Sequence, residues 1–246
     1  MLDGITPKGV LVDYGGTLVE ETGFDVRAGN EVLLARAAYR PPHVDIEHVL
    51  ARATTITNEV ANRRDEFNVE TPWPTLTRLI HDFLGIQFTD PMPELEMAFW
   101  KAAVTSTPMP GAREALEEFH LHGVPIGVVS NCSFGQDVIR YELAKHGLAD
   151  HLVFVMVSAE YSVRKPNRLL FETAAAKLGI ESQDIWFVGD RLEIDVAGAK
   201  SAGMKAIWFN APAGNTAHNA DLTVVDWESL MRCFRSCLSR GSEHGT

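Results

Sequence analysis

Long hydrophobic runs are missing from this chain of 246 residues. Its longest apolar stretches, such as LVFVMV at residues 152–157, are far too short to cross a bilayer. The first nine residues, MLDGITPKG, also lack the basic and then apolar pattern of a signal peptide. We therefore expect no membrane partner and a cytoplasmic location.

Cysteine is scarce as well. The three cysteines, Cys132, Cys233 and Cys237, cannot make a disulfide framework. Cys233 and Cys237 have the spacing that places two side chains on one face of a helix, and we expect them to pack as small apolar groups. Cys132 is expected to be a packing residue too, because no base is evident beside it.

Basic residues are outnumbered, with 22 Lys plus Arg against 33 Asp plus Glu and a net charge of −11. Such a surface repels nucleic acid and anionic membranes on average, so no nucleic-acid partner is expected. A small anionic substrate is still compatible with this charge, because a metal ion or a local cation can invert the field inside one pocket.

Short apolar runs alternate with helical patterns over most of the chain. After GVLVD at residues 9–13, runs that are apolar throughout, as in parallel strands covered on both faces, occur at 125–130, 152–157, 185–189, 205–209 and 222–225. Amphipathic stretches that end at or near a glycine, a common helix C-cap, separate them at 111–123, 135–147, 167–179 and 193–203. This alternation predicts an α/β fold with a Rossmann-like, three-layer core around a parallel sheet.

Residues 19–104 differ in kind. They hold amphipathic helical stretches broken by the segments RPP, TPWP and DPMP, and no convincing strand. We therefore predict an all-helical cap domain at 19–104, inserted into a core domain made of residues 1–18 and 105–246. Ligands of open parallel sheets bind beyond the carboxyl ends of the strands, so a cap that leaves the chain near Asp13 would cover that edge as a lid.

Polar residues follow several of the predicted strands. They lie in the stretches DYGGT with Asp13, VVSN with Ser130 and Asn131, VRKPNRLLF with Lys165, and VGDRLEIDVAGAKSAGM with Asp190, Glu193 and Asp195. The order and context of these stretches resemble those of the haloacid dehalogenase-like hydrolases with a helical cap, most of which are phosphatases. The resemblance covers residues 9–18 and about 108–210.

The resemblance implies a phosphoryl-transfer site. Asp13 would attack phosphorus and form an aspartyl-phosphate, which splits one difficult displacement into two steps. Ser130 and Lys165 would assist catalysis and hold the phosphoryl group. Asn131, Gly16 and Thr17 are also expected to bind phosphate.

The same resemblance implies a cofactor, Mg²⁺, which prefers oxygen ligands. Asp13, Asp190 and the main-chain carbonyl of Gly15 would bind it. Asp195 would pair with Lys165 and orient the site, and Glu193 is either a supporting acid or a solvated acid at the start of a helix. Taken singly, each of these residues has an ordinary structural explanation, such as a turn or a helix start; taken together, in this order, they favour a function.

One position departs from the family pattern. Phosphatases of this superfamily read Asp-x-Asp, and the second Asp protonates the leaving group and later activates water, whereas this chain has Gly15 there. Glycine keeps the carbonyl that a metal needs but loses a general acid that typically contributes about 10²–10⁴-fold. The loss matters most for alkyl phosphates. The cap or the substrate could supply a replacement.

Two other branches of the superfamily also lack that Asp. Dehalogenases need no metal, whereas Asp13 beside Asp190 calls for a cation, because two carboxylates about 4 Å apart repel by roughly 4 kcal/mol at an effective dielectric of 20. Phosphonatases need a cap lysine, and residues 19–100 contain none, which leaves only Lys101. The sequence thus predicts a Mg²⁺-dependent phosphatase of a small phosphorylated metabolite; the alternative is an impaired binder of phosphorylated ligands.

The predicted cap also holds arginines that suit the recognition of a carboxylate or phosphate. They are Arg27, Arg36, Arg40, Arg52, Arg63, Arg64 and Arg78. One or two of them are expected to reach an anionic substrate. The segment TPWPTL at residues 71–76 is either a rigid loop that faces the substrate or a connector between helices.

Overall fold

A parallel sheet forms the centre of the protein, in a computed structural model that describes residues 6–211 and 219–243. The strand order is β5-β4-β1-β6-β7-β8, and every neighbouring pair runs parallel. The strands are β1 (Gly9–Val12), β4 (Ile126–Ser130), β5 (Leu152–Val157), β6 (Ile185–Gly189), β7 (Lys205–Trp208) and β8 (Leu222–Thr223). They confirm the α/β prediction and lie close to the predicted apolar runs.

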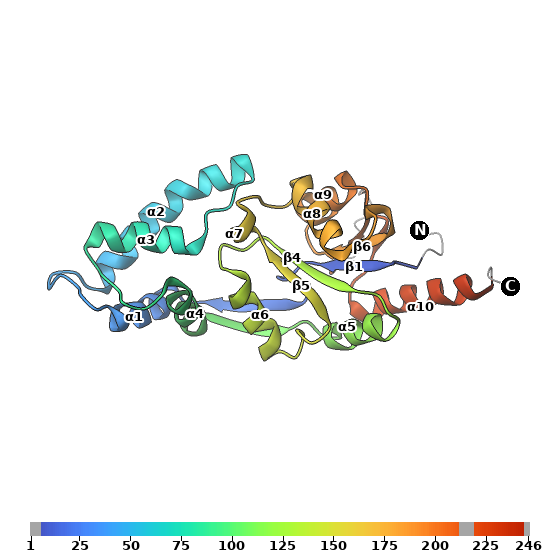
Figure 1. Cartoon of the computed structure of the whole chain (residues 1–246), viewed down its shortest axis with the longest axis horizontal. Helices are drawn as coiled ribbons and strands as arrows, with labels where there is room; N and C mark the ends of the chain where they lie inside the picture. Colours follow the sequence, from blue (N-terminus) through green and yellow to red (C-terminus); the bar gives the residue numbers. More distant parts are fainter. Residues whose placement is uncertain (1–5, 212–218, 244–246) are drawn as a thin grey trace.

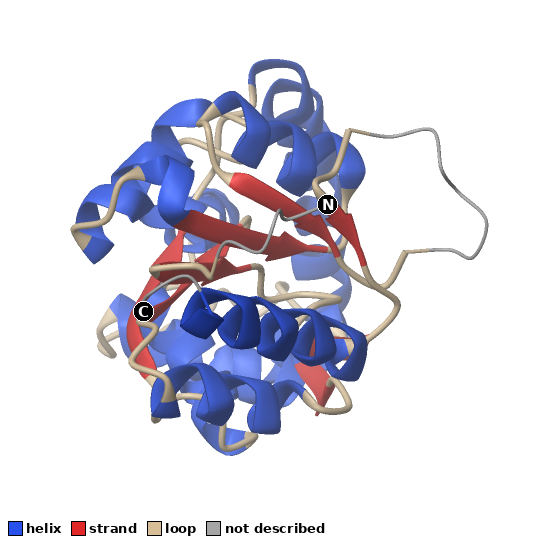
Figure 2. Cartoon of the chain, turned by 90° about the vertical axis from the view of Figure 1, so that its right-hand side faces the viewer, coloured by secondary structure: helices blue, strands red, loops and turns tan. Residues whose placement is uncertain are grey.

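Helices cover both faces of this sheet (Figure 2). On one face pack α5 (Ala112–Leu121), α6 (Gln136–Lys145) and α10 (Trp227–Glu243), and on the other α8 (Arg168–Leu178) and α9 (Ala197–Ser201). Alternate residues of β1 serve the two faces: Val10 and Val12 join the first core and Leu11 the second. Shorter pieces are α7 (Ser158–Tyr161), a 3₁₀ turn (Ser182–Asp184) and a π turn (Leu192–Val196).

The remaining helices lie between two strands that pair with each other. They are α1 (Val26–Arg36), α2 (Ile46–Phe67), α3 (Trp73–Leu84) and α4 (Met92–Ala103), called the helical insertion below, and they gather at one end of the molecule (Figure 1). Asp25 and Asp45 cap the first two helices by accepting backbone N–H bonds. Proline starts α3 and α4, where its missing N–H costs nothing.

The expectation that residues 19–104 contain no strand is wrong. β2 (Val19–Phe24) and β3 (Val104–Pro108) form an antiparallel hairpin through which the chain enters and leaves the helical insertion. β2 reads VEETGF and is mostly exposed, so it carries no apolar pattern. Its pairing with a distant segment makes it a strand. The division into a core domain and a cap domain stays a prediction.

The helical insertion is tied to the sheet end by polar and aromatic contacts. A β-bridge joins Val69 to Val163, and Glu70 is buried with the guanidinium of Arg164 as its ion-pair partner. Trp73, at the start of α3, packs its ring 5.6 Å from that of Phe134. TPWPTL is thus neither a loop nor only a connector: Pro72 caps α3, the next four residues form the first turn of that helix, and Trp73 joins the core. No helix among the described residues is long and apolar enough to span a membrane.

Candidate active site

The first predicted residue, Asp13, lies where β1 ends. All four residues of β1 are buried, and the backbone N–H of Asp13 donates to the carbonyl of Val188 on β6 (2.9 Å). The next residues form a sharp turn, in which the N–H of Val19 donates a hydrogen bond to the carbonyl of Tyr14 (3.0 Å). The strand end thus holds a buried carboxylate at the carboxyl edge of the sheet.

Lys165 lies between two carboxylates. Its Nζ is 2.6 Å from Oδ1 of Asp13 and 2.7 Å from Oδ1 of Asp195, and its side chain is 1% exposed. Asn131 fixes this lysine from the loop after β4: its Nδ2 donates to the Lys165 carbonyl (2.9 Å), and its Oδ1 accepts from the Lys165 N–H (2.7 Å). Asn131, predicted to bind phosphate, therefore uses its side chain to position Lys165.

The third carboxylate, Asp195, comes from the π turn after β6. Its Oδ2 accepts from the backbone N–H of Arg191 (3.1 Å), and the residue is 1% exposed. Gly189 makes this approach possible, since a Cβ there would lie 2.5 Å from the Asp195 Cβ. Asp195 is thus held in place by the backbone as well as by Lys165, as its predicted supporting position requires.

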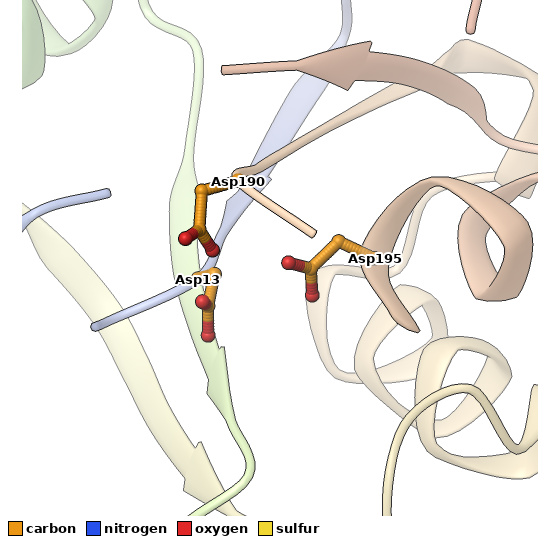
Figure 3. A group of neighbouring side chains, drawn as sticks. All are labelled: Asp13, Asp190 and Asp195. Atoms are coloured by element: carbon orange, nitrogen blue, oxygen red, sulfur yellow. The ribbon is translucent and has the colours of Figure 1, made fainter. Parts of the chain in front are cut away.

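Asp190 completes an acidic cluster. One ligand oxygen each from Asp13, Asp190 and Asp195 lies within 4.8 Å of the others, and Figure 3 shows the carboxyl groups of Asp13 and Asp190 beside each other. Oδ1 of Asp190 is buried and accepts no hydrogen bond from any described residue. Such an oxygen lacks the partner that a buried polar atom requires.

Burial and like charges dominate the electrostatics of the cluster. Burial raises the pKa of Asp13, the Lys165 ammonium lowers it, and the charges of Asp195 and Asp190 raise it; together these effects bring the pKa to about 7. Burial and Asp195 also raise the pKa of Asp190. An additional positive charge would therefore stabilise the ionised carboxylates. Residues Asp13, Gly15 and Asp190 fit a divalent cation at this edge.

A cavity of about 500 Å³ opens over these groups. Gly15, Gly16, Ser130 and Asn131 line it together with the three aspartates and Lys165. Thr17 and Glu193 do not line it. Thr17 is fully buried under the turn, with its carbonyl accepting from Trp227 Nε1 (2.9 Å), and Glu193 is exposed on the π turn.

The cavity walls contain residues that sequence reasoning did not select. They are Tyr14, Glu20, Glu21, Phe24, Trp100, Ser133, Phe134, Arg164, Arg191 and Ile194. Of the seven arginines considered, Arg64 lines the cavity. Lys101 does not; its ammonium lies 4.5 Å from the ring centre of Tyr141. No pattern in the sequence marks these wall residues, because they come from segments far apart in the chain.

Cys132 also lines the cavity, as its place after Ser130 suggested. Burial raises the pKa of its thiol, with smaller contributions from nearby carboxylates such as Glu21. The thiol therefore stays protonated, and a protonated thiol is a poor nucleophile. This agrees with a packing residue.

Comparison with known proteins agrees with this geometry. The chain is 32% identical to a ribulose-1,5-bisphosphate 5-phosphatase of Halopiger xanaduensis over 46% of this chain and 47% of that protein. It is 32% identical to a phosphoserine phosphatase of Thermus thermophilus over 48% of this chain and 46% of the relative. The matches thus span about half the length of these curated relatives.

Solved structures show the same fold. A 2-haloacid dehalogenase from Pseudomonas syringae pv. Tomato superposes with a TM-score of 0.64 at 20% identity, covering 94% of this chain and 98% of the other. The family model of the haloacid dehalogenase-like hydrolases matches residues 7–203, which contain β1, β4, β5 and β6, the acidic cluster and the helical insertion. The chain thus belongs to the haloacid dehalogenase-like hydrolase family.

Proposed function

We propose that this enzyme is a Mg²⁺-dependent phosphatase that cleaves a small phosphorylated metabolite through an aspartyl-phosphate on Asp13. The observation that carries this proposal is the arrangement at the cavity floor, where Asp13 lies between the Lys165 ammonium and the buried, unpartnered oxygen of Asp190. The phosphatase relatives support the same reaction class.

In this proposal each residue of the site has a distinct role in catalysis or binding. A carboxylate oxygen of Asp13 attacks phosphorus, while Lys165 and the Ser130 hydroxyl hold the phosphoryl oxygens. Asp195 and Asn131 keep Lys165 in place. Asp13, Asp190 and the Gly15 carbonyl would hold Mg²⁺, which would supply the positive charge that offsets repulsion between the carboxylates and the phosphate. Fixed charges aimed at developing charge are the main source of catalysis in such sites.

The cavity itself limits the substrate. Its volume of about 500 Å³ suits a small molecule. The arginines Arg64, Arg164 and Arg191 line it beside Glu20 and Glu21, so the part of the substrate beyond the phosphate meets both signs of charge. A small polar phosphomonoester fits this wall better than an apolar one.

A panel of phosphate esters and acyl phosphates, assayed by phosphate release with Mg²⁺, tests the proposal. Asp13→Asn should abolish turnover and leave the thermal midpoint close to that of the wild type. Glu193→Gln, at an exposed acid outside the cavity, is the matched control and should keep full activity. Undiminished turnover in Asp13→Asn would overturn the proposed nucleophile.

Two further results would favour the other candidates. A wild-type enzyme that binds phosphate esters without releasing phosphate would be an impaired binder. Chloride release from a 2-haloacid would indicate a dehalogenase instead. Both assays use the same purified protein, so a negative result for phosphate release leads directly to the alternative.

A further inference from the structure

The turn after Asp13 leaves an open space where a carboxyl group is missing. A Cβ built on Gly15 meets no atom within 4 Å, and Gly15 has no positive φ. Besides the three clustered aspartates, the acidic residues that line the cavity are Glu20 and Glu21, among the described residues. We infer that Glu21, on β2, gives a proton to the leaving group and later takes one from water. This inference rests on the proposed phosphatase function.

Backbone geometry places β2 beside the nucleophile. The N–H of Gly16 donates to the carbonyl of Val19 (2.9 Å), the first residue of β2, so this strand begins directly at the turn that contains Gly15. The register then shifts: Glu21 pairs with Ser106 and Gly23 with Thr105, which leaves Thr22 between them as a bulge. Bulges beside active sites re-aim side chains, and this one follows Glu21 directly.

The surroundings of Glu21 come from several elements. The charge of Glu21 raises the pKa of Tyr14, which follows β1, and that of Cys132, which follows β4. The charge of Glu142, on α6, in turn raises the pKa of Glu21. Glu21 also lines the same cavity as Asp13 and as Ser130, the last residue of β4. The proposed role requires that a leaving group bound over Asp13 extends within this cavity toward Glu21.

Several other titratable groups of the wall are poor proton donors, and Glu20 is compared directly in the test below. Burial raises the pKa of the Tyr14 hydroxyl and of the Cys132 thiol, so neither loses a proton readily. Lys165 is held by two carboxylates, and arginine does not lose its proton in proteins. Glu21 keeps an exposed surface, but its place in the cavity wall removes part of its water; this desolvation, followed by the charges of Glu142 and Glu20, raises its pKa. A carboxyl group with a raised pKa keeps its proton to higher pH than an ordinary glutamate does, which suits a general acid.

Glu142 is the neighbouring charge that contributes most to the raised pKa of Glu21, after burial. Burial opposes its ionisation, but hydrogen bonds from Lys145 (2.8 Å), Ser106 and Trp100 Nε1 (2.9 Å) outweigh burial and lower its pKa. His146 Nε2 also contacts the Ser106 hydroxyl (2.7 Å). Since Ser106 is the cross-strand partner of Glu21, β3 brings this network next to the proposed donor.

The chemistry balances over two steps. First, an Asp13 oxygen bonds to phosphorus, the bond from phosphorus to the leaving oxygen breaks, and the Glu21 proton passes to that oxygen to give an alcohol. Then Glu21, now a carboxylate, accepts a proton from water as the water oxygen bonds to phosphorus. The bond between phosphorus and Asp13 breaks, which releases phosphate and restores both carboxyl groups.

The test compares leaving groups in Glu21→Gln and in a matched control, Glu20→Gln, at the adjacent acid of the same strand. With Mg²⁺ present, Glu21→Gln should lower kcat/KM for alkyl phosphates by about 10²–10³-fold, within the usual contribution of a general acid, and change aryl phosphates by less than about 10-fold. Glu20→Gln should affect both substrate classes alike. Equal losses for both substrate classes in Glu21→Gln would overturn the inference.

A second variant restores the missing group from another position. Adding Gly15→Asp to Glu21→Gln should recover alkyl phosphate turnover, because the new carboxyl group has open space before it. Recovery supports proton transfer as the lost function, and a double variant that folds, binds Mg²⁺ and shows no recovery counts against it. If wild type hydrolyses no phosphate ester, the proposed function fails; if Asp13→Asn is inactive but Glu21→Gln is not, only this inference fails.

A pH profile provides the readout that a merely structural role would not change. The kcat/KM for an alkyl phosphate should fall with rising pH as Glu21 loses its proton. In Glu142→Gln the neighbouring negative charge is gone, so this fall should begin at lower pH. A fall at the same pH in both enzymes would overturn the proposed role of Glu142 in keeping Glu21 protonated.

Discussion

His81 should make the stability of this protein depend on pH. It lies in the last turn of α3, is 3% exposed, and packs its ring 4.8 Å from that of Phe88. Its Nε2 has no hydrogen-bond partner among the described residues. Burial lowers the pKa of His81 to about 4, although Asp82 opposes the shift. The folded protein therefore holds a neutral imidazole that the unfolded chain protonates near its ordinary pKa.

The sign and size of the effect follow from proton linkage. Because folding lowers the pKa of His81, this residue contributes to the free energy of unfolding. The contribution is complete above the unfolded pKa of about 6.5 and is lost as the pH falls toward about 4. At about 1.4 kcal/mol per pKa unit, the full loss is about 3 kcal/mol, of which about 2 kcal/mol is reached by roughly pH 5. The side chain is buried, so solvent screening does not reduce this value.

Urea unfolding of the wild type and of His81→Phe, each at about pH 7.5 and pH 5, measures this contribution. The variant keeps a ring against Phe88 and has no titratable group, so its free energy of unfolding should fall by about 2 kcal/mol less than that of the wild type. His43→Phe, at an exposed histidine, is the control and should behave like the wild type. Equal losses in wild type and His81→Phe would refute the reasoning.

Three further outcomes are expected. Mg²⁺ at about a hundred times its Kd should stabilise the wild type by about 2.7 kcal/mol in a thermal melt, and Asp190→Asn should show no such shift. Gly16→Ala should weaken Mg²⁺ binding in calorimetry, because φ is +69° and the new Cβ would lie 2.6 Å from the Asp190 Oδ2; unchanged affinity would contradict this geometry. Glu70→Gln should cost about 3–5 kcal/mol in urea unfolding by leaving Arg164 without its buried partner, whereas Glu66→Gln, at an exposed position, should be neutral.

The central sheet is determined largely by local sequence. Runs such as PIGVVS and IWFVG are apolar throughout, and each ends in a polar residue or a glycine. A parallel strand covered on both faces needs this pattern, and the structure places β4 and β6 there. The approach of Asp13, Lys165 and Asp190 to one edge follows from the same rule, because parallel strands end on the same side.

The walls of the cavity were decided only by the tertiary structure. β2 carries Glu20 and Glu21 and has no apolar pattern, and its pairing with β3 across the helical insertion makes it a strand. The Asn131 side chain forms hydrogen bonds with the backbone of Lys165 although the two residues are 34 positions apart in the chain. Periodicity reports which side of an element is buried, but it does not report which distant segment meets it there. The residues that line the cavity, including the proposed proton donor Glu21, can therefore be identified only from the folded chain.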